Sequence, residues 1–249
     1  MGQFWETIPT SLIPWIQEQH LFWVATAPLS ESGHVNLSPK GLEGTFHVVD
    51  EQTVWYEDMT GSGVETISHL RENGRITILF AAFEGPPRIV RLFGTGVVYE
   101  FGTPEYEALL PPGTQNHASR AVIMVKVHKV GSSCGYAVPF YEFKYHRTRY
   151  YNVARTLEAV DVTHENECPA EQFDLASPPE KGLRAYWKNV NEKSLDGLPA
   201  LLYAPMRKLG ARDDLEPEKA TVFDSKHSKS KTAGMSVGFA MAIVYMQRV

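Results

Sequence analysis

Two short segments, about twenty residues apart, contain the residue types that could bind an anion. Residues 36–41 (Asn-Leu-Ser-Pro-Lys-Gly) place the cation of Lys40 at the end of an expected strand. Residues 58–66 (Asp-Met-Thr-Gly-Ser-Gly-Val-Glu-Thr) form a glycine-rich turn that opens an expected helix. The free backbone N–H groups of such turns and helix starts attract negative charge. Together with Lys40 they predict a site for a phosphorylated ligand.

The same glycine-rich turn also suits a nicotinamide dinucleotide. It follows a strand and opens a helix, and Glu84 lies about twenty residues further on, where a ribose-binding acid is expected. However, Thr66 stands where the third glycine should be. The preceding strands are also short and alternating, unlike the continuous apolar strands of a parallel sheet. Because these two points count against a dinucleotide site, a nicotinamide-dinucleotide-dependent enzyme is only a second alternative function.

Other motifs give weaker evidence for catalysis or metal binding. Residues 131–135 (Gly-Ser-Ser-Cys-Gly) have the spacing of a nucleophile elbow, but an extended stretch with Pro139 follows instead of the required helix. The nine histidines show no zinc-binding spacing, so no metal site is predicted. No side chain stands out as a general acid or base, and the catalytic residues stay unassigned.

A succession of short antiparallel strands is expected to position the two segments. Strands are predicted over residues 20–27, 35–38, 45–49, 53–57, 75–83, 88–99 and 121–130. Residues 84–87 are too few for a helical crossover and predict a hairpin. Helices are predicted over residues 10–19, 62–72 and 103–110, with Ser62 and Thr103 as N-caps and Gly74 as a stop. This pattern predicts a small closed or nearly closed barrel.

Composition excludes several classes of protein. The 249 residues, 43% of them hydrophobic, suffice for one large domain or one domain with an appendage. A net charge of −5 argues against nucleic-acid binding, which needs clustered Lys and Arg. Two cysteines are too few for a disulfide framework, and the N-terminus lacks the pattern of a secretory signal. We therefore expect a reducing, cytoplasmic location.

The second half of the chain differs in character. Helices are expected over residues 147–158 and 181–191. The apolar segment 233–246 has about 14 residues, whereas a bilayer-spanning helix needs roughly 20. We expect this segment to pack on the core, and membrane contact is possible but not favoured.

Three motifs make the chain resemble the pyridoxamine phosphate oxidase-like flavoproteins. They are residues 38–41, the strand–loop–helix at 55–70, and residues 88–94 (Arg-Ile-Val-Arg-Leu-Phe-Gly), within a similarity that spans about residues 20–130. The resemblance implies a mainly β fold, namely a six-stranded antiparallel split barrel of Greek-key type. We expect this barrel over residues 1–145, with a helical extension over residues 146–249 packing on it. It also implies FMN as cofactor and a homodimer, because the flavin site of the family is shared between subunits.

The resemblance assigns Lys40 as the phosphate-pairing cation and Arg91 as an inward cation near the flavin ring or phosphate. The cofactor-binding residues are expected to be Ser38, Lys40, Asp58, Met59, Thr60, Gly61, Ser62, Gly63, Val64, Thr66 and Arg91. Two departures argue against a true pyridoxamine phosphate oxidase. Gly61-Ser62-Gly63 replaces the Ser-Arg-Lys of those enzymes and so lacks two cations, and Ile89 replaces a glutamine.

The resemblance predicts an FMN-dependent oxidoreductase acting on a small molecule. In such a protein the flavin carries the electrons, and the polypeptide tunes it through hydrogen bonds and charge. The alternative is a non-catalytic protein that binds flavin or another phosphate ligand.

Overall fold

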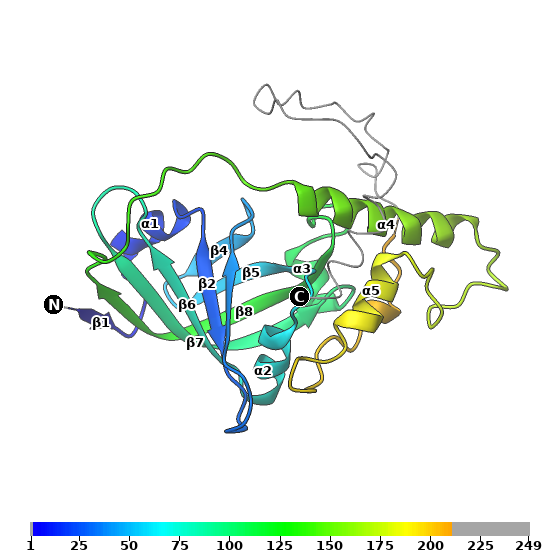
Figure 1. Cartoon of the computed structure of the whole chain (residues 1–249), viewed down its shortest axis with the longest axis horizontal. Coiled ribbons are helices and arrows are strands. Elements are labelled where there is room, and N and C mark those ends of the chain that lie inside the picture. The colour runs from blue at the N-terminus through cyan, green and yellow to red at the C-terminus, as the bar shows by residue number, and fades with distance from the viewer. Residues whose placement is uncertain (1, 211–249) are drawn as a thin grey trace, which may run out of the picture. The chain divides into compact units, whose positions relative to one another are not determined.

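An eight-stranded antiparallel sheet forms the centre of the computed structural model, which describes residues 2–210 (Figure 1). The strand order is β3-β2-β6-β7-β8-β5-β4, and β1 pairs with β8. The strands are β1 Gln3–Trp5, β2 Phe22–Thr26, β3 Asn36–Lys40, β4 Phe46–Asp50, β5 Thr53–Met59, β6 Arg75–Ala81, β7 Ile89–Glu100 and β8 Ser119–Ser133. The predicted mainly β, antiparallel class is confirmed, with eight strands instead of six. The three residues of β1 are too few to show a strand pattern.

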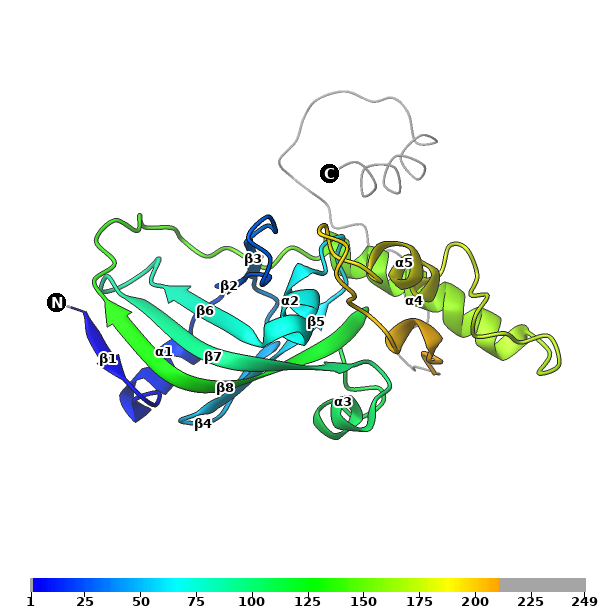
Figure 2. The ribbon, with the colours of Figure 1, turned by 90° about the horizontal axis from the view of Figure 1, so that it is seen from below.

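The two longest strands, β7 and β8, give the sheet its curvature. Their pairing runs from Ile89–Ser133 to Glu100–Ala121 and shifts register between Phe93 and Gly94. A Cβ at Gly94 would lie 2.7 Å from the carbonyl oxygen of Lys126, so only glycine fits the close approach at this bulge. Figure 2 shows both strands curving beneath the rest of the sheet.

The curved sheet encloses an aromatic core. The ring centroid of Phe46, on the edge strand β4, lies 5.0 Å from that of Phe22 on β2 and 5.1 Å from that of Phe80 on β6. These strands are distant in the sheet order, so the side chains meet across the interior. Buried aromatic pairs of this kind contribute beyond their burial. The sheet is therefore rolled around a packed core.

Local signals set the helices that adjoin the site. Helix α2 (Glu65–Asn73) ends at Gly74, whose φ of 70° is left-handed, as the sequence predicts. Its N-cap is Val64 rather than Ser62, so the predicted helix start is wrong and Ser62 stays in the loop. Helix α3 (Pro104–Leu109) begins as predicted, because the Thr103 side chain accepts a hydrogen bond from the N–H of Tyr106.

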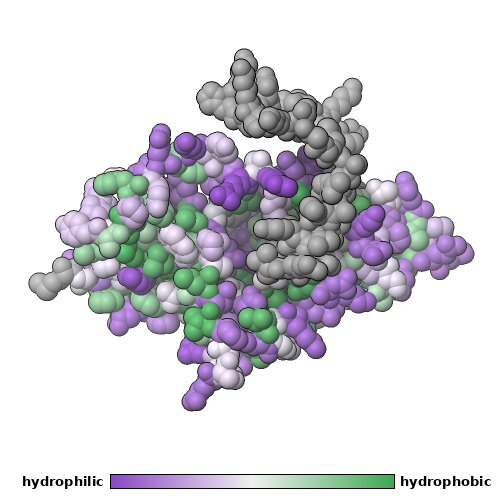
Figure 3. All heavy atoms as spheres, viewed as in Figure 1, coloured by the Kyte–Doolittle hydropathy of each residue, from purple (hydrophilic) through white to green (hydrophobic). Residues whose placement is uncertain are grey.

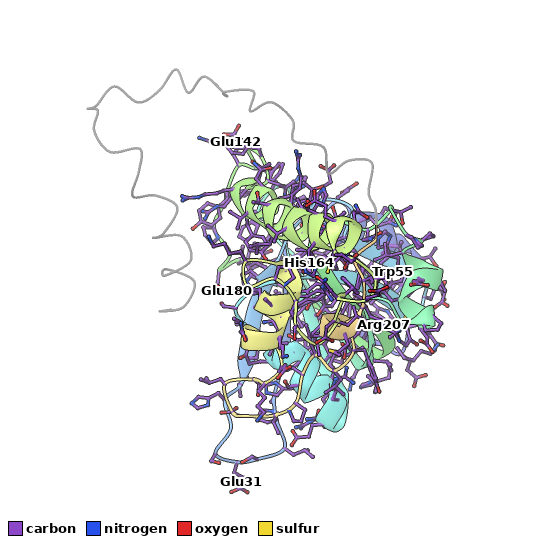
Figure 4. The ribbon with its side chains drawn as sticks, turned by 90° about the vertical axis from the view of Figure 1, so that its right-hand side faces the viewer. Glu31, Trp55, Glu142, His164, Glu180 and Arg207 are labelled. Atoms are coloured by element: carbon purple, nitrogen blue, oxygen red, sulfur yellow. The ribbon has the colours of Figure 1, made fainter. Side chains whose placement is uncertain are left out.

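The remaining helical segments lie between β1 and β2 or after β8. They are η1 Thr10–Leu12, α1 Ile13–Gln17, α4 Arg149–Glu167, α5 Leu183–Val190 and η2 Ala204–Met206. Helices α4 and α5 lie side by side (Figures 2 and 4). Residues 134–148 reach α4 as a largely irregular segment along the barrel (Figure 2). The proposed domain boundary at residue 145 remains a prediction.

The segment 233–246, which is expected to pack on the core, lies outside the described residues. Among residues 2–210, none of the helices combines the length and the apolar character that crossing a bilayer requires.

Candidate functional site

The two predicted anion-binding segments meet at one cleft of about 1200 Å³. Its lining residues include Lys40 at the end of β3, Met59 at the end of β5, and Thr60 and Gly61 directly after β5. They meet because β3 and β5 both end at this cleft. Binding sites for a single small ligand usually have about 300–1,000 Å³, so a nucleotide-sized ligand fits.

The ammonium group of Lys40 is held by a buried carboxylate. Its Nζ lies 2.9 Å from Oδ1 of Asp58, and Nε of Arg120 lies 2.8 Å from Oδ2. Burial acts to raise the pKa of Asp58, but the charges of Arg120 and Lys40 outweigh it and hold this pKa below its ordinary value. Two cations share one carboxylate, so the cluster keeps one net positive charge beside the cleft.

Arg120 was missed by the sequence analysis. Its guanidinium, buried at 2% exposure, donates from Nη1 to the carbonyl oxygen of Gly61 at 3.3 Å and from Nη2 to that of Gly63 at 2.8 Å. It therefore connects the glycine loop to Asp58. The signal in the sequence was a lone arginine at the start of an apolar strand, which seldom occurs without a buried partner.

The loop that Arg120 holds presents free hydrogen-bond donors. Among the described residues, the backbone N–H groups of residues 61–64 donate to no acceptor. Thr60 fixes the start of the loop, because its N–H and its hydroxyl both donate to the carbonyl oxygen of Ala118, at 2.9 and 2.6 Å. Four consecutive free donors beside a net positive cluster form a suitable cradle for an anion.

The other residues predicted in these segments lie around this cradle. Ser62 and Gly63 are exposed, and Val64 is buried at the helix start. Thr66 is buried and accepts a hydrogen bond from Nδ2 of Asn36 at 3.0 Å. The buried Oγ of Ser38 has no hydrogen-bond partner among the described residues.

Arg91 does not belong to this cluster. It alternates on β7 with Val90 and Leu92, which are fully buried, so its side chain lies on the opposite face of the strand. Its Nη1 lies 3.4 Å from Oγ of Ser133. The inward orientation expected for Arg91 is therefore wrong, because strand alternation gives that direction to its neighbours.

Aromatic side chains from residues 141–151 form a wall of the cleft that the sequence analysis did not anticipate. The ring of Phe143 stacks on His20 at 3.7 Å, and its backbone N–H donates to Glu84 at 3.0 Å. Arg147 also lines the cleft and supplies a further cation. On the face drawn in Figure 3, hydrophobic residues gather over the barrel strands, whereas the far end of α4 is mostly hydrophilic. The sequence of this irregular segment shows no helical or strand periodicity, so the sequence analysis could not predict this wall.

The sheet topology rules out a dinucleotide-binding βαβ unit at the glycine loop. Strand β5 pairs with β4 and β8, and β6 pairs with β2 and β7, in every case antiparallel. The strands on either side of α2 are therefore not parallel neighbours, so the glycine loop is not the dinucleotide-binding fingerprint on which the nicotinamide-dinucleotide alternative was based.

The fold and the cleft define a barrel protein of mainly antiparallel sheet, with a glycine-rich loop of free backbone donors between β5 and α2. A family model described as pyridoxamine 5'-phosphate oxidase matches residues 11–134. The curated pyridoxamine 5'-phosphate oxidase family protein ustO of Aspergillus flavus is 37% identical over 224 residues, which cover 84% of this chain and 82% of that protein. The chain belongs to the pyridoxamine 5'-phosphate oxidase family.

Two solved structures are also similar in part. A variant of HupZ from Group A Streptococcus is 25% identical, with a TM-score of 0.42 over 51% of this chain and 99% of that chain. A Clostridium acetobutylicum protein related to general stress protein 26 is 15% identical, with a TM-score of 0.36 over 49% of this chain and 84% of that chain.

Proposed function

We propose that this protein binds FMN and uses it for oxidoreduction of a small molecule. The observation that carries the proposal is that Lys40 and Gly61 line one cleft, and that Gly61 begins a run of free backbone N–H groups at residues 61–64. Family membership supports a flavin as the ligand, because the family is described as pyridoxamine 5'-phosphate oxidase. FMN carries a terminal phosphate dianion, which these donors suit.

The residues present fit the phosphate group. Gly61 leaves open space, since an added Cβ would meet no atom within 4 Å, so a ligand can approach the backbone closely. Lys40 has three ammonium donors and spends one on Asp58, which leaves two for a ligand. Arg120 contacts the loop that lacks the Ser-Arg-Lys motif, and Arg147 is a further cation in the lining of the cleft.

The remaining walls fit a flat ring system. Leu21, Pro39, Ala81 and Phe83 make one side apolar, and the aromatic residues 141–151 line another. When bound, FMN supplies hydride or electron transfer. The chain's own residues bind and orient the ligand and exclude water. Burial raises the pKa of the Tyr150 phenol in this wall, so its hydroxyl stays protonated at neutral pH and can donate a hydrogen bond.

We also propose that the protein is a homodimer, which follows from the resemblance to flavoproteins that share the cofactor between subunits. A non-catalytic flavin-binding protein is the alternative, because no side chain in the described cleft has been assigned as a general acid or base.

Turnover distinguishes the two functions. FMN-loaded protein is mixed with NADH or NADPH without oxygen, and the flavin absorbance is followed before a panel of small-molecule acceptors is added. An oxidoreductase is expected to bleach and then recover its flavin absorbance with at least one donor and one acceptor. Binding of FMN without any turnover across the panel would leave the binding function and refute the catalytic one.

A further inference from the structure

The helical extension contacts the glycine loop directly. Nδ2 of Asn191, the residue that ends α5, donates to the carbonyl oxygen of Gly61 at 2.9 Å. Nε1 of Trp187 on α5 donates to Oγ1 of Thr60 at 2.7 Å. Both donors belong to fully buried side chains. These contacts join residues that are 130 and 127 positions apart, so they tie the extension to the proposed phosphate site.

The same loop is held from the barrel side by Arg120. Gly61 thus receives two donors on one carbonyl oxygen, from Arg120 and Asn191, and Gly63 receives one from Arg120. In a planar trans peptide the C=O and the following N–H point in opposite directions. Because these two carbonyl groups point toward Arg120, the N–H groups of Ser62 and Val64 point away from it.

We propose that Arg120, Asn191 and Trp187 are positioning residues that fix the loop with its N–H groups outward and so make the site select a phosphorylated flavin. We call the three side chains the carbonyl clamp, although Trp187 acts one residue earlier, through the hydroxyl of Thr60. This inference rests on the proposed FMN binding. It assigns a role to the extension, because α5 helps to hold the loop that binds the phosphate. This support takes the place of the two cations that the loop lacks.

The geometry favours positioning over simple packing. A flexible glycine loop loses much conformational freedom when it binds a ligand, and donors fixed beforehand reduce that cost. Arg120 suits this task, because its planar guanidinium can donate to Asp58, Gly61 and Gly63 at once. Arg120 and Asn191 contact the carbonyl oxygens of Gly61 and Gly63, on the side opposite to the N–H groups of Ser62 and Val64, so they leave these two donors open to a ligand.

The test compares FMN with riboflavin, which has the same ring and ribityl chain but no phosphate. Dissociation constants of both are measured by flavin fluorescence for the wild-type chain and for Asn191→Leu, which removes the donor to Gly61 at similar volume. The ratio of the riboflavin constant to the FMN constant is expected to fall about 3- to 10-fold, the typical effect of one lost hydrogen bond. The riboflavin constant itself should change little.

Asn73→Leu is the matched control. Nδ2 of Asn73 also donates to a backbone carbonyl, that of Ala27, at 2.9 Å, but at the far end of α2 from the loop. This variant should keep the wild-type ratio. If Asn191→Leu does not fold, Trp187→Phe keeps an aromatic ring, removes the donor to Thr60, and is expected to lower the ratio about 2- to 5-fold.

The outcomes separate the inference from the function on which it rests. A wild-type protein that binds FMN tightly, together with clamp variants that keep its preference over riboflavin, would overturn the clamp alone. An equal loss of affinity for FMN and for riboflavin would also overturn the clamp, because it would indicate that the substitution disturbs the whole site. A wild-type protein that binds neither flavin would refute the proposed function and the clamp with it.

Discussion

At the scale of single residues, Asp58 fixes the position of the Lys40 cation beside the cleft. It lies between Lys40 and Arg120, all within one ion-paired cluster, and its carboxylate is fully buried. A buried carboxylate with two cations keeps both in place, whereas removing it would leave two positive charges close together. The cleft therefore presents an oriented ammonium group rather than a mobile one.

Replacing Lys40 tests this ammonium group. Lys40→Ala is expected to weaken FMN binding by about 1.5–3 kcal/mol, as for a lost hydrogen bond to a charged group. Lys126→Ala, which removes an exposed lysine bonded to Gln52 on the sheet, is the control and should bind FMN as the wild type does. The measurement is fluorescence titration of the apoprotein with FMN. Unchanged affinity in Lys40→Ala would remove this residue from the site.

Asp58 should also make stability depend on pH. Its pKa is lower in the folded chain than in the unfolded chain, so its contribution is present at neutral pH and is lost as the pH falls below about 4. Asp58→Asn is expected to lower the free energy of unfolding by about 3 kcal/mol at pH 7, and by less at acid pH. Denaturant unfolding at several pH values checks this, with the exposed Glu171→Gln as control. If the free energies of unfolding of Asp58→Asn and the wild type differ by the same amount at every pH, the lowered pKa of Asp58 would be contradicted.

At the scale of elements, one carboxylate joins three parts of the chain. Glu100, at the end of β7, accepts hydrogen bonds from the backbone N–H groups of Leu202, Tyr203 and Ala204, and pairs with Arg71 of α2. It is buried at 1% exposure. The segment that leads into η2 is thereby fixed to the barrel, close to the helix that follows the glycine loop.

Glu100→Gln tests this anchor. The amide keeps the size of the side chain but replaces one accepting oxygen with a donor, so a destabilisation of about 2–3 kcal/mol is expected. Hydrogen exchange of the N–H groups of residues 202–204 should accelerate more than exchange in the barrel strands. Glu107→Gln, on the exposed side of α3, should change neither quantity. Equal exchange in both variants would contradict the anchor.

The elements show how far the sequence can predict the structure. The hairpin predicted at residues 84–87, the Thr103 cap and the Gly74 stop depend on neighbouring residues, and all three are confirmed, with the hairpin connection spanning residues 82–88. Lys40 and the glycine loop were also recognisable, because each has a local pattern. Arg120 and Asn191 were not, because their roles come from contacts with Gly61 across 59 and 130 positions of the chain.

At the scale of the whole molecule, the proposed homodimer can be tested by measuring the molar mass of the protein in solution. The chain has a mass of 27.9 kDa, so light scattering after size-exclusion chromatography should give about twice that value. Exposed apolar residues such as Phe4 and Val97, at 65% and 49% exposure, are consistent with a covered surface. A mass equal to a single chain at micromolar concentration would contradict the homodimer.

The central claim is that the cleft between Lys40 and the glycine loop holds FMN. The visible absorption spectrum of protein purified without added cofactor tests it most directly, followed by release of the bound compound and its chromatography beside FMN, riboflavin and FAD. We expect a yellow protein with the absorption bands of oxidised flavin, and FMN as the released compound. A colourless protein that also gains no flavin bands when FMN is added would contradict the account.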